Sequence, residues 1–307
     1  MSRYIIYIIN PVSGTRAKKD LQQLIEKETN KRNIAFEIFP SVADANYSFL
    51  LPVIKEKKVT DIVIAGGDGT VSQVAGSLMN TGVNFGIIPC GSGNGLALTA
   101  KIPPQPLKAL EIIFNNKKSP IDGFYVNDPA HPGSGRRFAC MLCGLGFDAK
   151  VAHDFADQPK RGLATYARMA MKNFFSMKPQ RFRLKVNGAT IDTSAYFISI
   201  ANSNQFGNNF TIAPRASLSD GLLDIVIVTS KNKISFLIQT LRQLAGWNKL
   251  QTSSVVNEKR GVIYFQAKKL HIYNPDSAHL HIDGDPAEAT KELAIEIKEK
   301  CFRLLQP

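Results

Sequence analysis

The chain has 307 residues, of which 44% are hydrophobic and 21% are charged, and its formal net charge is +13. This composition excludes a disordered chain, and the length is sufficient for two domains that each have a core. The positive charge predicts an anionic partner and leaves open whether that partner is nucleic acid, an acidic membrane surface or a phosphorylated substrate.

The chain begins with a short apolar run, Tyr4 to Ile9, which Asn10-Pro11 ends. Because no small-residue cleavage site follows, this run predicts a strand and not a signal peptide. No apolar run reaches the roughly 20 residues that span a bilayer, so we expect any membrane contact to be peripheral. With only four cysteines, a disulfide scaffold is not expected, which favours a cytoplasmic location.

The first third of the chain alternates between strand and helix patterns. Apolar runs at residues 4–9, 34–39, 61–65 and 85–88 predict strands. Helical periods occur around residues 21–28 and 47–54, and again from Val71 onward. This alternation predicts an α/β domain with a Rossmann-like, mainly parallel sheet that has helices on both faces.

Three turn-rich loops follow strands of this sheet, at the edge where such sheets bind ligands. They span Asn10 to Gly14, Gly66 to Thr70, and Pro89 to Gly95. Glycines let backbone amides approach a phosphate closely, and a helix that follows presents its N-terminus to the same anion. An Asp-Gly hairpin turn is the alternative for the second loop, but the residues after it have a helical period. Together the loops predict a phosphate cradle.

After about Asp122 the pattern changes to short β-rich runs separated by turn signals such as Asn187-Gly188. This texture predicts a second, mainly antiparallel domain. We expect the first domain to span residues 1–122 and the second residues 123–290. We expect residues 291–307 to return to the first domain.

Glycine- and aspartate-rich motifs occur along almost the whole chain. They are Asn10-Pro11-x-Ser13-Gly14, Gly66-Gly67-Asp68-Gly69-Thr70, Gly91-Ser92-Gly93-Asn94-Gly95-Leu96-Ala97, Gly144-x-Gly146-Phe147-Asp148-Ala149, Asp220-Gly221-x-Leu223-Asp224 and Asp283-Gly284-Asp285. In this order they resemble the diacylglycerol kinase catalytic family, which includes bacterial lipid kinases, sphingosine kinases and ceramide kinases. The resemblance implies an N-terminal nucleotide-binding domain and a C-terminal, mainly antiparallel β-sandwich that binds lipid. It also implies a kinase that uses ATP and magnesium to phosphorylate a lipid hydroxyl between the two domains.

The resemblance further implies which residues contact the nucleotide. They are Asn10, Pro11, Val12, Ser13 and Gly14 in the first loop, Gly66, Gly67, Asp68, Gly69 and Thr70 in the second, Gly91, Ser92, Gly93 and Asn94 in the third, and Ser41. Phosphoryl transfer needs positioning and charge stabilisation more than covalent chemistry. Asp68 is therefore expected to act on magnesium through water.

A structural magnesium ion is implied at Asp220, with backbone oxygens near Ser217 and Leu222 as further ligands. The alternative is an ordinary turn in which the Asp220 side chain caps its own backbone.

The chain departs from the family at Asp285, because the usual motif is Asp-Gly-Glu and the glutamate is the proposed general base. Aspartate shortens the reach by one C–C bond, about 1.5 Å, and a misplacement of about 1 Å can cost around 100-fold in rate. Either the backbone compensates, or the acceptor is not a simple glycerol hydroxyl, or catalysis is lost. We favour retained catalysis, with Asp285 and Asp68 as catalytic residues, because the nucleotide loops are intact. Asp283 is the nearest alternative carboxylate, for the metal or for the loop.

The segment from Gln158 to Ile191 has no Asp or Glu and includes Lys160, Arg161, Arg168, Lys172, Lys178, Arg181, Arg183 and Lys185. Part of it has the pattern of an amphipathic helix. It predicts either peripheral binding to an anionic membrane or a packed helix with a solvated basic face. A second candidate helix, Ile234 to Trp247, is expected to pack on the protein. No nucleic-acid-binding module accompanies the charge, so no nucleic-acid partner is expected, and a homodimer is left open.

Two other functions stay open. NAD kinases share the Gly-Gly-Asp-Gly motif, so the acceptor could be a soluble nucleotide, although the motifs at Asp220 and Asp283 favour a lipid. A catalytically weak regulator that binds nucleotide or lipid is the other alternative, and only Asp285 suggests it.

Overall fold

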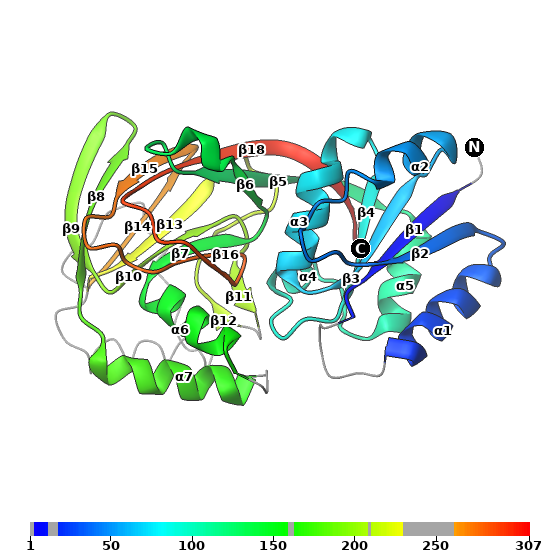
Figure 1. Cartoon of the computed structure of the whole chain (residues 1–307), viewed down its shortest axis with the longest axis horizontal. Helices are drawn as coiled ribbons and strands as arrows, with labels where there is room; N and C mark the ends of the chain where they lie inside the picture. The colour runs from blue at the N-terminus through cyan, green and yellow to red at the C-terminus, as the bar shows by residue number, and fades with distance from the viewer. Residues whose placement is uncertain (1–2, 12–17, 159–162, 208–209, 230–260) are drawn as a thin grey trace.

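The computed structural model describes residues 3–11, 18–158, 163–207, 210–229 and 261–307. Two lobes lie side by side, one with a parallel sheet covered by helices and one built from stacked sheets, and strand β18 (Glu292–Leu305) runs between them (Figure 1). The predicted fold class, a parallel α/β part followed by a mainly antiparallel β-sandwich, is confirmed.

The N-terminal lobe has a parallel sheet in the order β2-β1-β3-β4. Its strands are β1 (Tyr4–Ile9), β2 (Ala35–Pro40), β3 (Asp61–Gly66) and β4 (Asn84–Pro89). Strands β3 and β4 are buried along their whole length, as expected for apolar strands with helices on both faces. Helices α1 (Lys18–Asn30) and α5 (Pro106–Asn115) lie on one side of the sheet, and α2 (Leu50–Glu56) and α3 (Asp68–Leu78) lie on the other (Figure 1). The 3-10 helix η1 (Met79–Thr81) and the short helix α4 (Gly95–Thr99) precede and follow β4.

Helix α3 begins earlier than its apolar period predicts. Its first residue is Asp68, Gly67 is the extended N-cap, and the amide of Val71 donates to the carbonyl of Gly67. The period begins only at Val71, because the first turn of the helix contains no apolar residue. Asp68, Gly69 and Thr70 are therefore the first turn of a helix and not a separate loop.

The C-terminal lobe contains an antiparallel sheet in the order β14-β13-β10-β7-β16-β17. Its strands are β7 (Leu142–Gly146), β10 (Phe197–Ala201), β13 (Leu223–Val228), β14 (Val262–Ala267), β16 (Leu280–Ile282) and β17 (Asp285–Ala287). A second group extends the N-terminal sheet and comprises β5 (Lys118–Asn127), β6 (Arg137–Ala139), β8 (Gln180–Val186), β9 (Ala189–Ala195), β15 (Lys269–Tyr273) and β18. Apolar side chains of both groups, such as Leu145 and Ile272, share one core between them. This shared core makes the lobe a sandwich.

The remaining elements lie on the outer side of the sandwich or at its edges. Helices α6 (Phe147–Ala156) and α7 (Leu163–Ser176) lie beneath the antiparallel sheet (Figure 1), and Phe174 and Met177 pack in a core that also contains Val226 of that sheet. The 3-10 helix η2 (Pro132–Ser134) and the short strands β11 (Gln205–Gly207) and β12 (Phe210–Thr211) complete the described elements.

Strand β18 belongs to both lobes. Its first half pairs with β15, and its end pairs in parallel with β4 at Arg303 and Leu304. A register shift interrupts its pairing with β5 between Lys298 and Phe302. The buried carboxylate of Asp122 accepts the amide of Lys300 inside this irregularity at 2.6 Å and the amide of Gly221 at 2.7 Å. Asp122 thus fixes the strand where it passes from one lobe to the other.

Candidate active site

The carboxyl ends of the parallel strands meet at the predicted phosphate cradle. Asn10 follows β1, and its side-chain amide donates to Oγ1 of Thr70 in the first turn of α3 at 2.8 Å. The amide of Cys90, after β4, donates to the carbonyl of Gly66 at the end of β3 at 3.0 Å. Three loops that are far apart in the sequence are therefore hydrogen-bonded to one another.

The glycines of the second and third loops let two backbones touch. A Cβ atom built on Gly91 would lie 2.6 Å from Cα of Gly67, and one built on Gly67 would lie 3.2 Å from Cα of Gly91. Neither glycine has positive φ, so the close approach and not a left-handed conformation requires glycine here. Any larger residue would push the two loops apart.

Asn94 closes the third loop on itself. Its Oδ1 accepts the amide of Gly91 and its Nδ2 donates to the carbonyl of Gly91, both at 2.8 Å. Asn94 has a φ of 55°, in the left-handed region that asparagine tolerates better than most residues. The family resemblance implies that Asn94 contacts the nucleotide, which stays a prediction, and its two hydrogen bonds to Gly91 shape the loop.

Asp68 connects the second loop to helix α4. Its Oδ2 accepts the amide of Gly95 at 2.9 Å and its Oδ1 accepts the amide of Leu96 at 3.0 Å. Burial raises the pKa of Asp68 to about 6, although these two amides lower it. The carboxylates of Asp283 and Asp285 add to the rise in pKa because they repel a negative charge on Asp68.

The N-terminus of α3 lies within this group of loops. Its N-cap is Gly67, which has no side chain to accept the first amides, and the helix is 11 residues long. The first amides of such a helix have no intrahelical acceptor and carry partial positive charge. Phosphate groups bind at helix N-termini for this reason.

Asp285 lies against this same helix terminus. A Cβ atom built on Gly69 would lie 2.9 Å from Cγ of Asp285. Asp285 is the first residue of β17 and its side chain is exposed. The exposed carboxylate of Asp285 is therefore in direct contact with Gly69 in the glycine-rich second loop of the other lobe.

Asp283 is buried and belongs to the loop. Its Oδ1 accepts the amides of Met141 at 3.0 Å and Leu142 at 2.8 Å, and its Oδ2 accepts the amide of Cys140 at 3.0 Å and the hydroxyl of Ser72. Burial raises the pKa of Asp283, and these hydrogen bonds act in the opposite direction. With its oxygens engaged in this way, Asp283 joins α3 to the bend between β6 and β7. Sequence reasoning left this role open, because it depends on partners in distant segments.

The other predicted nucleotide residues have less defined positions. The amide of Ser41 donates to the carbonyl of Ile9 at 3.0 Å, so Ser41 lies at the carboxyl edge of the sheet. Ser92 is exposed and Gly93 half-buried in the third loop, and Pro11 is exposed after β1. Val12, Ser13 and Gly14 lie outside the described residues.

At the implied structural metal site, Asp220 caps its own turn. Its Oδ1 accepts the amide of Leu222 at 3.1 Å, and the following Gly221 has a φ of 73°. Ser217 precedes this turn. The described residues contain no cluster of three or more His, Cys, Asp or Glu side chains placed to hold a metal ion. The capped turn accounts for the geometry at Asp220, and the metal there stays a prediction.

The magnesium expected at the nucleotide does not require such a cluster. Mg²⁺ usually retains several waters and binds to only one or two carboxylates together with substrate phosphates. Asp68 supplies a carboxylate in the first turn of α3, and its chemistry fits that mode of binding.

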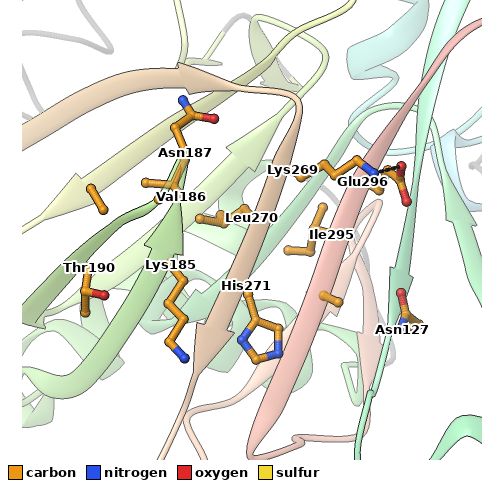
Figure 2. Close-up of a pocket in the computed structure, with 13 residues that line it drawn as sticks. Asn127, Lys185, Val186, Asn187, Thr190, Lys269, Leu270, His271, Ile295 and Glu296 are labelled. Carbon is orange, nitrogen blue, oxygen red and sulfur yellow. Dashed lines mark ion pairs between the residues drawn. The ribbon is translucent and has the colours of Figure 1, made fainter.

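A cavity in the described part of the chain lies elsewhere. It has a volume of about 490 Å³ and lies on the sheet formed by β8, β15 and β18, where Lys185, His271 and Ile295 line it and Lys269 pairs with Glu296 (Figure 2). None of the predicted site residues lines it. Its walls are side chains of a solvent-facing sheet, so we assign it no role in the reaction.

The basic segment is divided between two elements. Arg168 and Lys172 are exposed on α7, whereas Arg181 and Arg183 lie on β8 and pair with Asp276 and Asp192. Lys160 and Arg161, and the candidate helix at residues 234–247, lie outside the described residues. In the part of the chain that the structure describes, no helix combines the length and the apolar character needed to cross a membrane.

Comparison with known proteins assigns both lobes. Residues 4–126 match the family model of the diacylglycerol kinase catalytic domain, and residues 142–291 match that of the YegS C-terminal NAD kinase beta sandwich-like domain. The diacylglycerol kinase of Bacillus subtilis (strain 168) is 25% identical over 285 residues, which cover 91% of this chain and 88% of that protein. A protein of Klebsiella pneumoniae (strain 342) named "Probable lipid kinase YegS-like" is 27% identical, covering 81% of this chain and 78% of that protein.

The fold matches solved structures over nearly the whole length. The crystal structure of a diacylglycerol kinase from Bacillus anthracis str. Sterne superimposes with a TM-score of 0.72 at 17% identity and covers 99% of this chain and 97% of that chain. At this identity the structural match supports the fold alone. The two domain matches and the curated relatives show that the chain belongs to the diacylglycerol kinase catalytic-domain family.

Proposed function

We propose that the protein is an ATP- and magnesium-dependent lipid kinase that transfers the γ-phosphoryl group to a lipid hydroxyl. The observation that carries the proposal is the contact between Asp285 and Gly69. It places an exposed carboxylate beside the helix terminus to which the glycine loops belong. A phosphate bound at this helix terminus and an acceptor hydroxyl at this carboxylate would lie next to each other.

On the donor side, the N-terminal amides of α3 and the close-packed Gly67 and Gly91 form the phosphate-binding surface. The hydrogen bond from Asn10 to Thr70 holds the first and second loops together. Bound magnesium would neutralise charge on the phosphates, and Asp68 is the residue that would hold it, through water. Phosphoryl transfer requires positioning and electrostatic stabilisation of this kind.

On the acceptor side, Asp285 is the proposed general base. Its carboxylate is within contact distance of the α3 backbone despite the shorter aspartate side chain. This contact supports retained catalysis, with the loop backbone compensating for the missing methylene. Asp283 is buried, and its carboxylate already accepts three backbone amides. Of the two aspartates in this motif, Asp285 is therefore the one with access to an acceptor hydroxyl.

Phosphorylation of a soluble nucleotide is the second candidate. Residues 142–291 match a family model described as NAD kinase beta sandwich-like. The glycine motif of the second loop occurs in lipid kinases and in NAD kinases alike. A transfer assay distinguishes the two. We would incubate the protein with γ-labelled ATP and Mg²⁺ and offer diacylglycerol, sphingoid bases, ceramide, phosphatidylglycerol and NAD in separate reactions.

Label in a lipid product, lost in Asp68→Ala, is the expected result. Label only in NAD would replace the lipid kinase with the NAD kinase candidate. Transfer to none of these acceptors, with ATP still bound, would point to a nucleotide-binding regulator. Transfer that persists undiminished in Asp68→Ala would contradict the assigned site.

We also propose that the protein binds peripherally to anionic membranes through the basic face of α7. Arg168 and Lys172 are exposed on this helix, and each cation near an anionic surface contributes about 1 kcal/mol. Sedimentation with phosphatidylglycerol vesicles tests this, with Arg168→Gln/Lys172→Gln as the variant. Equal binding by the variant and the wild type would contradict the proposal.

A further inference from the structure

A histidine and an aspartate form a buried pair beneath the antiparallel sheet. His281 of β16 and Asp148 of α6 are 2% and 6% exposed, and Nε2 of His281 lies 3.4 Å from Oδ2 of Asp148. The other oxygen of Asp148 accepts the amide of Ala149 at 2.8 Å. The proposed nucleotide and base residues do not include this pair.

Gly144 provides the space for the pair. It lies directly opposite His281 in the pairing of β7 with β16. A Cβ atom built on Gly144 would lie 2.9 Å from Cγ of Asp148 and would also overlap with Nε2 of His281. The first glycine of the motif at residues 144–149 is therefore explained by the side chains that cover it.

The other ring nitrogen of His281 contacts the loop that carries Asp285. The amide of Gly284 donates to Nδ1 of His281 at 3.3 Å. Because Nδ1 accepts this hydrogen bond, the neutral ring carries its proton on Nε2, where it can be donated to Asp148. The carboxylate of Asp148 thus favours the tautomer in which Nδ1 accepts the loop amide.

The loop is a two-residue turn, because Ile282 and Asp285 on either side of it are paired. Asp283 and Gly284 both have positive φ, 50° and 84°, as in a type I′ hairpin turn. Asp283 is held by its buried carboxylate, whereas Gly284 has no side chain and can adopt many conformations. The amide of Gly284 directly precedes Asp285, so a hydrogen bond that holds this amide also restricts the direction in which Asp285 leaves the turn.

We propose that His281, oriented by Asp148, is a positioning residue that fixes the Gly284 amide and thereby holds Asp285 against the N-terminus of α3. The inference rests on the proposed kinase function, because it assigns to His281 a share in the placement of the general base. The group that matters is the acceptor at Nδ1.

Two substitutions separate this acceptor from the rest of the ring. The side-chain oxygen of asparagine occupies the place of Nδ1, whereas the amide of glutamine reaches the place of Nε2. His281→Asn therefore keeps an acceptor for Gly284, and His281→Gln keeps only the contact with Asp148. We expect kcat for lipid phosphorylation to stay within about threefold of the wild type in His281→Asn. In His281→Gln it should fall about 10- to 100-fold, as expected for a misplacement approaching 1 Å.

The KM for ATP should be unchanged in both variants, because neither touches the glycine loops. Equal loss of kcat in both variants, or the greater loss in His281→Asn, would overturn the inference. A wild-type protein without transfer to any acceptor would instead overturn the proposed function, so the two failures are distinguishable.

If neither variant folds, the imidazole ¹⁵N spectrum of the wild-type protein at pH 8 decides the question. A proton on Nε2 of His281 is expected, and a proton on Nδ1 would refute the inference. The result also stands if no kinase substrate is found, because the tautomer does not depend on activity.

Discussion

Gly69→Ala is the substitution that most specifically tests the contact between the two lobes. The added Cβ would lie 2.9 Å from Cγ of Asp285, whereas carbon atoms at optimal contact are about 3.5–4.0 Å apart. Asp285 must therefore move by about 0.6–1.1 Å, which is possible because its side chain is exposed at the start of β17. A misplacement of about 1 Å can cost around 100-fold in rate, so we expect kcat to fall about 10- to 100-fold.

The stability of this variant should change in the opposite direction. Gly69 lies in the first turn of α3 with an ordinary φ, and alanine is favoured over glycine in helices by up to about 1 kcal/mol. Thermal unfolding should therefore show an equal or higher Tm, while transfer of label from ATP to lipid declines. Gly133→Ala is the matched control, because a Cβ there meets nothing within 4 Å and its φ is ordinary. Full kcat in Gly69→Ala would refute the contact, and a lowered Tm would attribute the loss to unfolding instead.

Three further substitutions test the supporting structure. Asp283→Ala leaves three buried amides and the hydroxyl of Ser72 without their acceptor. Because each unsatisfied group costs about 1–3 kcal/mol, urea unfolding should show a free energy of unfolding lowered by at least about 3 kcal/mol. A decrease below about 1 kcal/mol would contradict the role assigned to Asp283. Burial raises the pKa of Asp224 from its ordinary value of 3.8 to about 7. Between these pH values the folded state holds a proton that the unfolded state has lost. The free energy of unfolding should therefore fall by an amount on the order of 2–4 kcal/mol as the pH rises from 4 to 7. Asp224→Asn should remove that decline, and equal pH profiles of unfolding free energy would refute it. Asn94→Ala loses both hydrogen bonds to Gly91 and should weaken ATP binding about tenfold by calorimetry, whereas unchanged affinity would show that the third loop does not contact the nucleotide.

The strand ends and their loops could be predicted from the sequence because their signals are local. Alternating apolar runs and helical periods indicated the parallel sheet, and in a parallel sheet the carboxyl ends of strands share one edge. The hydrogen bond between Asn10 and Thr70 and the contact of Gly67 with Gly91 show the loops brought together at that edge. The start of α3 at Asp68 was missed because its first turn has no apolar residue.

Contacts between distant segments could not be predicted, because a side chain's type does not specify its partner. Asp68 and Asp283 are both aspartates next to glycine, yet one caps α4 and the other accepts amides from the bend between β6 and β7. The sequence gives only a weak indication of the pair formed by His281 and Asp148. His279 and His281 are two residues apart, which in a strand places them on the same face. Both face α6, where His279 stacks on His153 with ring centroids 5.0 Å apart. The glycine opposite His281 is explained only once the sheet pairing is known.

Turnover of Asp285→Asn tests the central claim most directly. Asparagine keeps the size of the side chain and its contact with α3 but cannot accept a proton from the acceptor hydroxyl. If Asp285 is the general base, kcat for transfer from ATP to lipid falls about 10²- to 10⁴-fold, while the affinity for ATP stays within about twofold of the wild type. Wild-type kcat in Asp285→Asn would contradict the account.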